Sequence, residues 1–150
     1  MADYRIEILA HDWQRFDEVL ELYYDVLYGP FGVARDFDWY HPAHGSRFAI
    51  ALGAGDELLG SARLLPETGD EMRQVRQVVV ASSAQGLGVG RELMTAIERV
   101  AAEEGALELW LHARHTAFGF YEALNWEFVG EPFVSELTGV LHREMRKRLG

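Results

Sequence analysis

The sequence predicts a mixed α/β (α+β) fold, with helices packed on the faces of one sheet. Segments with alternating or wholly apolar residues, as in strands, are interspersed with segments whose apolar residues recur at helical spacing. The expected order is β-α-loop-β-β-β-α-β-α-β-β, and interleaving of this kind is typical of layered sheet-and-helix folds. In addition, a glycine-rich loop joins an apolar strand directly to a long helix.

The N-terminal part predicts one strand and one helix. Apolar and charged side chains alternate over residues 4–9, as in a half-buried strand. Asp12 is expected to cap a helix whose apolar stripe runs from Trp13 to Leu27. Gly29-Pro30 should end this helix, and residues 30–45 have little periodicity and are expected to be irregular.

The middle of the chain predicts three strands. Residues 48–52 and 58–65 form a hairpin around the glycine-containing turn 53–56. Residues 75–81 are β-branched and nearly all apolar towards their end, which is typical of a central strand buried on both faces.

The C-terminal part predicts two helices and three strands. Helical spacing of apolar residues starts at Val89, and Gly105 is a suitable C-cap. Thr116 is expected to cap a second, short helix. The remaining elements are a strand at 107–111, the short helix at 117–124 and closing strands at 127–130 and 140–145.

Composition limits the class of protein. A chain of 150 residues with 49% hydrophobic and 25% charged residues is expected to be one folded domain, residues 1–150. The absence of cysteine excludes disulfides, thiolate metal sites and a cysteine nucleophile. No apolar stretch is long enough for a membrane span and the N-terminus has no signal pattern, so a cytoplasmic location is expected.

The chain carries 24 Asp+Glu and 14 Lys+Arg, a formal net charge of −10. This charge disfavours general binding to nucleic acid, because phosphates would be repelled. His41 and His44 lie in a proline-containing loop without a third ligand, so no metal site is expected there.

The glycine-rich loop predicts an anion site. Gly86, Gly88 and Gly90 alternate where an apolar strand meets a helix, so the free N–H groups of the helix start can face one ligand. The loop lacks the Lys of a P-loop, and it comes too late in the chain for the usual dinucleotide fold. A merely tight turn stays open as an alternative.

Two segments together resemble the GNAT superfamily of N-acetyltransferases. Residues 80–90 resemble its acetyl-coenzyme A motif, with Gln85, Gly88 and Gly90 at the defining positions. Residues 119–126, GFYEALNW, resemble its second signature, with Asn125 in place of the usual glycine. Asparagine tolerates the left-handed conformation, so this departure is mild.

A narrower resemblance is to the ElaA-like branch of the superfamily. It is carried by residues 111–114, 130–133 and 139–145, with Leu141 where the branch has proline. The resemblance covers about residues 46–147 and implies a mostly antiparallel central sheet with helices on both faces.

The resemblance implies the residues that would bind acetyl-CoA. In the family a central strand offers backbone groups to the pantetheine arm and the loop holds the pyrophosphate. Arg91 could equally be solvated surface, and Arg114 could instead form ion pairs. The expected cofactor-binding residues are Val78, Val79, Val80, Gln85, Gly86, Leu87, Gly88, Val89, Gly90, Arg91, Arg114, Ala117 and Phe120.

The resemblance also implies an acid and leaves the base open. Tyr121 stands at the position of the family's general acid, although a core aromatic is the alternative. Where many members have a glutamate, this chain has Gln74, Arg76 and Gln77. The base could be His142, which titrates near neutral pH. Glu71, His112 and a water relay are weaker alternatives.

The expected function is therefore acetyl transfer from acetyl-CoA to the amine of a small molecule or peptide. A non-catalytic acyl-CoA sensor and a nucleotide-binding protein of another fold are the alternatives. Exposed closing strands would suit a homodimer. Residues 1–60 hold eleven acids, and the segment 36–41 could line the acceptor site, so a cationic acceptor is expected.

Overall fold

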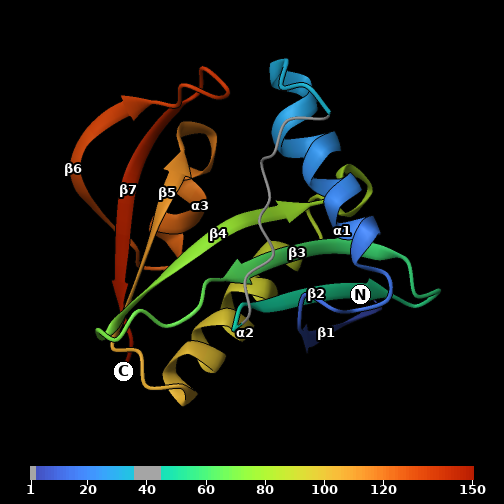
Figure 1. The fold of residues 1–150 in the computed structure, drawn as a ribbon, viewed down its shortest axis with the longest axis horizontal. Helices are drawn as coiled ribbons and strands as arrows, with labels where there is room; N and C mark the ends of the chain where they lie inside the picture. Colours follow the sequence, from blue (N-terminus) through green and yellow to red (C-terminus); the bar gives the residue numbers. More distant parts are fainter. Residues whose placement is uncertain (1–2, 36–44) are drawn as a thin grey trace.

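The computed structural model describes residues 3–35 and 45–150. Its centre is a seven-stranded sheet with the strand order β1-β2-β3-β4-β5-β7-β6 (Figure 1). Neighbouring strands run antiparallel throughout, except that β4 and β5 run parallel. The expected mixed, mostly antiparallel sheet is confirmed.

All the strands expected from the sequence are present, and several are longer than the local pattern indicated. Pairing with β7 extends from Glu108↔Arg148 to Arg114↔His142, so β5 continues past Leu111. The strands are β1 (Tyr4–Leu9), β2 (Arg47–Gly53), β3 (Leu58–Leu64), β4 (Met72–Val80), β5 (Glu108–Arg114), β6 (Glu127–Val134) and β7 (Leu141–Arg148).

The first helix differs from its prediction at both ends. Helix α1 (Phe16–Tyr23) begins after Arg15 with no side-chain cap, so Asp12 does not cap it. It continues as a π-helical turn, η1 (Tyr24–Tyr28), and a 3-10 turn, η2 (Gly29–Phe31). Gly29-Pro30 does not end the helical run, because proline is tolerated in a first turn whose N–H groups lack helical partners.

The later helices follow the sequence more closely. Helix α2 (Val89–Glu103) ends before Gly105, whose φ of 94° fits the expected C-cap region. Helix α3 (Phe118–Ala123) follows the 3-10 turn η4 (His115–Ala117), so Thr116 lies inside a turn and does not cap the helix. Asn125 has a φ of 70°, the left-handed conformation expected of it. No helix in the described ranges has the length and apolarity needed to cross a membrane.

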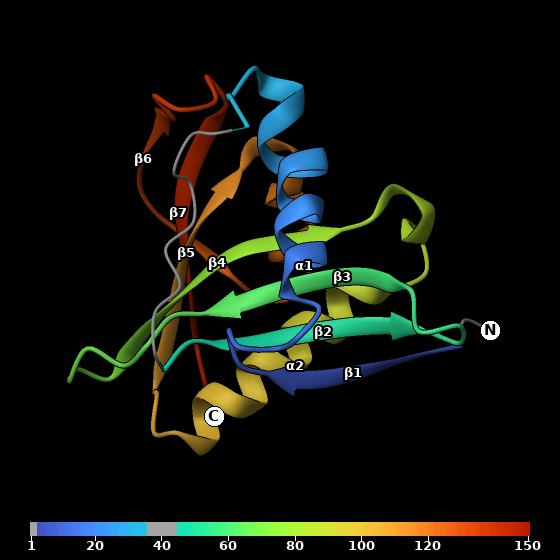
Figure 2. The same ribbon diagram turned by 45° about the vertical axis from the view of Figure 1, so that its right-hand side comes forward.

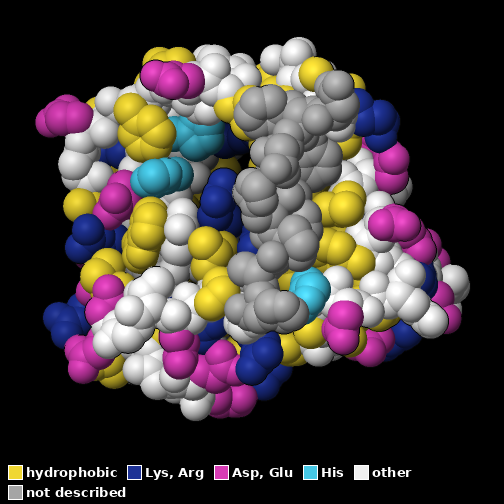
Figure 3. Space-filling model, viewed as in Figure 1, with side chains coloured by type: hydrophobic (Ala, Val, Ile, Leu, Met, Phe, Trp, Pro, Cys, Tyr) yellow, Lys and Arg dark blue, Asp and Glu magenta, His cyan; other side chains and the backbone are white. Residues whose placement is uncertain are grey.

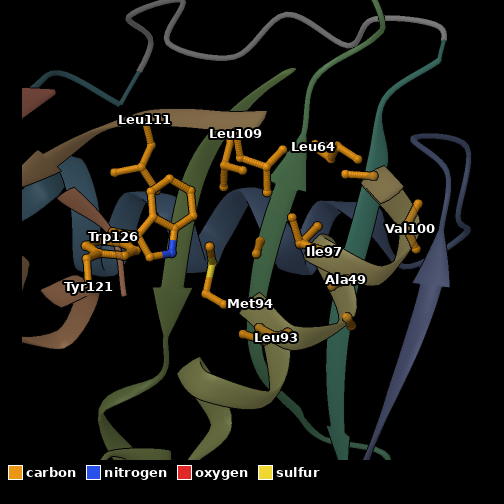
Figure 4. Close-up of a cluster of buried hydrophobic side chains, with 14 of the residues drawn as sticks. Ala49, Leu64, Leu93, Met94, Ile97, Val100, Leu109, Leu111, Tyr121 and Trp126 are labelled. Atoms are coloured by element: carbon orange, nitrogen blue, oxygen red, sulfur yellow. The ribbon is translucent and has the colours of Figure 1, made fainter. Parts of the chain in front are cut away.

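The helices cover both faces of the sheet. Figure 2 shows α1 on one face and α2 on the other. On β2, Phe48 and Ile50 face α1, whereas Ala49 and Ala51 face α2. Helix α2 contributes Leu93, Met94 and Ile97 to the larger buried cluster, which Figure 4 shows together with Tyr121 and Trp126.

Strand β4 contains a bulge that the sequence did not reveal. Gln77 has a φ of 53°, and the pairing with β3 shifts by one residue between Ser61 and Arg63. The extra residue reverses the alternation beyond it, so Val78 and Val80 pack towards α2 while Val79 packs towards α1.

A buried ion pair ties the start of β4 to the end of α2. Arg73 is 3% exposed, and its Nη1 lies 2.6 Å from Oε1 of Glu104. Arg47 Nε is 2.9 Å from the other oxygen of this carboxylate. Burial alone would raise the pKa of Glu104, but the hydrogen bonds from Arg73 and Arg47 outweigh it and hold that pKa below its ordinary value.

Replacing Glu104 by glutamine should destabilise the fold. The change leaves the buried Arg73 cation without a counter-charge, and we expect a loss of about 1–3 kcal/mol at pH 7 by urea unfolding. The neighbouring Glu103→Gln removes an exposed pair with Arg99 and should cost less than about 0.5 kcal/mol.

The effect of Glu104→Gln should also depend on pH. Because the pKa of Glu104 is depressed in the folded state, its stabilisation is complete above the ordinary value of 4.5 and is lost as the pH falls through the folded pKa. The difference between wild type and variant should therefore shrink below pH 4.5. A difference that stays constant down to pH 3 would contradict this role.

Candidate active site

The site begins where β4 and β5 part. Their parallel pairing covers Met72↔Glu108, Arg73↔Leu109 and Gln74↔Trp110, and beyond it the strands diverge (Figure 1). A cavity of about 1390 Å³ opens there. It exceeds the roughly 300–1,000 Å³ of a pocket for one small ligand, so it has room for two reactants.

The glycine-rich loop lies at one end of this cavity. Gly86 and Gly88 have φ values of 81° and 80°, which glycine adopts without strain. The first intrahelical bond of α2 runs from Glu92 N–H to Gly88 O, at 3.2 Å. The N–H groups of the preceding helical residues therefore have no partner within the helix and are available to an anion.

Gly90 is required for a different reason. A Cβ atom at this position would lie 3.2 Å from Cζ of Phe120. The ring of Phe120 therefore packs directly on the first turn of α2 and brings α3 to the loop. Both residues line the cavity.

The end of β4 offers backbone groups to the cavity. Ala81 N–H donates to Leu59 O at 2.8 Å, and alternation in an antiparallel ladder turns the polar groups of Val80 to the opposite edge. There the carbonyl of Val80 accepts a hydrogen bond from Gln85 Nε2, at 3.1 Å. Val78 also lines the cavity, and its side chain remains in the core.

Two of the residues expected to bind the cofactor are not part of the cavity lining. Val79 pairs with Ser61 of β3, and its side chain belongs to the α1-side cluster, because the bulge reversed its orientation. The Leu87 side chain is 47% exposed and does not line the cavity. The other expected residues, Val78, Val80, Gln85, Gly86, Gly88, Val89, Gly90, Arg91, Arg114, Ala117 and Phe120, all line it.

Tyr121 lies in the cavity wall on α3. It is 6% exposed, and its ring contacts those of Phe120 and Trp126 edge-on, with centroids 5.0 and 5.7 Å away (Figure 4). Burial raises the pKa of its hydroxyl above the ordinary value. The hydroxyl therefore carries its proton at neutral pH and can act as a donor.

His142 lies on β7 with one ring nitrogen fixed. Its Nδ1 is 2.8 Å from the carbonyl of Val140, which can only accept, so Nδ1 holds the proton and Nε2 has the lone pair. Burial lowers the pKa of His142, and the positive charge of Arg114 and the neighbouring histidines lowers it further. The ring is thus neutral at pH 7 and can accept a proton at Nε2.

Arg114 lies at the end of β5, opposite His142 in the pairing of β5 with β7. Its Nη2 donates to the carbonyl of Leu27 at 2.5 Å, and its guanidinium lies 4.7 Å from the ring centre of Phe31. Both contacts are on the α1 side of the sheet, so the side chain points away from the α2 face, where Val78 and Val80 pack.

Comparison with known proteins agrees with this geometry. A model of the Acetyltransferase (GNAT) family matches residues 13–126. The chain belongs to the GNAT family. A Bacillus subtilis (strain 168) protein named as an acetyltransferase is 28% identical over 118 residues, which cover 77% of this chain and 76% of the relative. Streptothricin acetyltransferase of Streptomyces lavendulae is 31% identical over 88 residues, or 57% of this chain and 47% of the relative.

Solved structures share the GNAT fold over the whole chain. A Lactobacillus plantarum protein named as an N-acetyltransferase superposes with a TM-score of 0.85 at 22% identity, and the match covers 99% of both chains. Escherichia coli ElaA gives a TM-score of 0.80 at 21% identity, covering 97% of this chain and 99% of its own. An aminoglycoside 6'-N-acetyltransferase complexed with coenzyme A gives 0.77 at 18% identity, covering 96% of each chain.

Within this GNAT site, the structure adds residues that the sequence did not single out as lining. Gln77 Nε2 donates to the hydroxyl of Tyr28 at 3.1 Å, and both residues line the cavity. The bulge in β4 directs Gln77 towards the cavity, and the π-helical turn places Tyr28 in the cavity lining. Glu71 lies at the start of β4 outside the cavity lining, so it is not placed to act as the base.

The acidic N-terminal part does not supply the charge of the cavity. Of the eleven acids in residues 1–60, Asp36 and Asp38 fall outside the described residues, and none of the other nine lines the cavity. The charged lining in the described ranges consists of Arg76, Arg91, Arg114 and Glu136. Those nine acids therefore give no support to the expectation of a cationic acceptor, which stays a prediction.

Two expectations concern residues 36–44, which lie outside the described ranges. They are the acceptor-site cluster at 36–41 and the loop with His41 and His44. Elsewhere in the described part of the chain, His, Asp and Glu form no group that could hold a metal ion.

Replacing Gly88 by alanine should weaken the binding of coenzyme A. Alanine at a φ of 80° is strained by about 1–2 kcal/mol, so the loop must shift and its N–H groups lose their alignment. We expect the Kd, measured by calorimetry, to rise about 10-fold. Gly119→Ala enters open space on α3 at an ordinary φ and should leave the Kd unchanged. Equal effects of both changes would contradict the anion site.

Proposed function

We propose that the protein is an N-acetyltransferase that moves acetyl from acetyl-CoA directly to a primary amine of a small molecule or peptide. One observation carries the proposal. The gap between β4 and β5 joins a glycine-rich anion site to a cavity lined by a proton donor, Tyr121, and a proton acceptor, His142. Family membership and the coenzyme A complex of a neighbour of the same fold support it.

The proposed cofactor site has two parts. The free N–H groups at the start of α2 would hold the pyrophosphate, with Arg91 beside them. The backbone of Val78 and Val80 would bind the amide groups of the pantetheine arm. The Val80 carbonyl accepts a hydrogen bond from Gln85, and an amide of the arm would compete with Gln85 for it.

The proposed chemistry uses one proton acceptor and one proton donor. Acetyl-CoA supplies an acyl group activated as a thioester. Nε2 of His142 takes the proton that the amine loses as its nitrogen bonds to the carbonyl carbon. As the carbon–sulfur bond breaks, the hydroxyl of Tyr121 donates its proton to the sulfur. Exchange with solvent then returns His142 and Tyr121 to their starting states.

A second candidate function is that of an acyl-CoA sensor without turnover. It is favoured by Gln77, because this residue of β4 stands near where many family members have a glutamate base. Its side-chain oxygen is 3.4 Å from Nη1 of Arg63, and an amide cannot accept a proton from an amine at neutral pH.

Measuring release of the coenzyme A thiol with a panel of amines separates the two functions. An N-acetyltransferase should release thiol in step with N-acetyl product, which mass spectrometry detects. Tight acetyl-CoA binding in calorimetry without turnover on any amine would support the sensor instead.

Tyr121→Phe should slow the chemical step. The change removes the proton donor and keeps the buried ring, so kcat should fall by roughly 10²–10⁴ with the KM for acetyl-CoA little changed. Circular dichroism should confirm an intact fold. An unchanged kcat with an unchanged pH profile would show that Tyr121 is only a core aromatic.

His142→Gln should remove the acid limb of the pH profile of kcat. Because the base must be unprotonated and its pKa is lowered, wild-type kcat should rise with pH through a pKa below 6.5. The variant should lose this limb, and its kcat should fall by roughly 10²–10⁴. His115→Gln changes an exposed histidine outside the cavity lining and should keep the limb. A limb that persists in His142→Gln would point to a water relay.

A further inference from the structure

The guanidinium of Arg114 is incompletely partnered for its degree of burial. It is half-buried, and within residues 3–35 and 45–150 it bonds one carbonyl, that of Leu27, lies against the ring of Phe31 and interacts electrostatically with Tyr28, but it has no carboxylate partner. A guanidinium has five N–H donors and keeps its charge at any physiological pH. By contrast, the buried Arg73 has the carboxylate of Glu104 at 2.6 Å.

Arg114 lies on the side of the sheet proposed for the acceptor, and the proposed binding site for the cofactor phosphates lies on the other side. Trp110, His112 and Arg114 alternate along β5 on the face that looks towards α1. The phosphate-binding N–H groups belong to the first turn of α2, which covers the other face. Arg114 pairs directly across with His142, whose Nε2 is the proposed proton acceptor.

The part of the cavity around Arg114 combines apolar walls with one charged group. Leu27 and Phe31 line the cavity from the α1 side, and Phe133 lines it from β6. The ring of Phe133 stacks on His142, with centroids 5.7 Å apart and planes 20° from parallel. In Figure 3, histidine and Lys or Arg side chains gather in the region of β5 and β7.

Around Arg114, the described cavity lining has a charge opposite to that of the whole chain. The chain has a net charge of −10, whereas Arg114 has no acidic neighbour in the described cavity lining other than the exposed Glu136. A half-buried cation is stabilised when a ligand brings a carboxylate, which can accept two parallel N–H bonds from a guanidinium.

We propose that Arg114 binds a carboxylate of the acceptor, so that the substrate is a small amino acid-like amine. The carboxylate lies against the guanidinium, and the amino group is directed to the neighbouring Nε2 of His142. The product is then an N-acetyl amino acid. This inference rests on the proposed acetyl transfer and names its substrate class.

Matched acceptors test the proposal. L-Leucine, leucinamide and 3-methylbutylamine share a side chain but differ at the position of the carboxylate. Wild-type kcat/KM should be at least about 10-fold higher for L-leucine than for either of the others, as expected for a hydrogen-bonded charge pair. Phosphoethanolamine and ethanolamine form a second pair, which separates a carboxylate site from a phosphate site.

Arg114→Gln should abolish this preference by raising the KM for L-leucine at least about 10-fold. The KM for acetyl-CoA should stay within about 2-fold of wild type, and the kcat/KM for 3-methylbutylamine, which has no carboxylate, should fall less than that for L-leucine. The matched control is Arg143→Gln, which changes an exposed arginine that bonds Gly130 O outside the cavity lining and should keep the preference.

The outcomes are distinct. Turnover of amines with no preference for the carboxylate would overturn the carboxylate site and leave the acetyltransferase intact. A preference confined to phosphoethanolamine would overturn it in favour of phosphate. A raised KM for acetyl-CoA in Arg114→Gln, equal for all amines, would assign Arg114 to the cofactor. Absence of turnover on every amine would instead contradict the proposed function.

Discussion

The early end of the ladder between β4 and β5 is the constraint on which the rest of the site depends. Buried backbone groups must find partners, and β5 supplies them to β4 only as far as Gln74↔Trp110. Beyond that point the carbonyl of Val80 turns to Gln85, and the glycine-rich loop folds back on the strand. Arg73, in the paired part of β4, is tied to the end of α2 through Glu104. The cavity is thus a consequence of how the sheet is paired.

The fold and part of the site could be predicted from the sequence, and the division has a physical basis. The loop at Gln85–Gly90 and the segment around Tyr121 are each contiguous in the sequence, so each motif can be recognised from one stretch of chain. The bulge at Gln77 and the extension of β5 to Arg114 arise from pairing with distant strands, which local periodicity does not record. The start of α1 was misplaced because Asp12 has the chemistry of a cap but not its position.

The sheet separates the two halves of the proposed reaction. The loop and Tyr121 belong to the side covered by α2 and α3, whereas the α1 side holds the Arg114 side chain, with His142 paired to it across the sheet. The gap is where the two sides communicate, and its walls are strands, which fix side chains more firmly than loops do. This arrangement lets the acceptor side vary while the cofactor side keeps its backbone contacts, which suits a fold shared by relatives of low sequence identity.

The hydrogen bond from Gln85 to Val80 also bears on how tightly the product is held. A ligand amide that competes for this carbonyl would exchange one hydrogen bond for another, so the contact adds selectivity more than net affinity. In the proposed reaction, coenzyme A would leave through the same exchange, with the glutamine amide taking its place. Because the glutamine amide can replace the ligand amide at this carbonyl, release of the product would be favoured over its retention. The strand would keep its hydrogen bond and stay ordered between catalytic cycles.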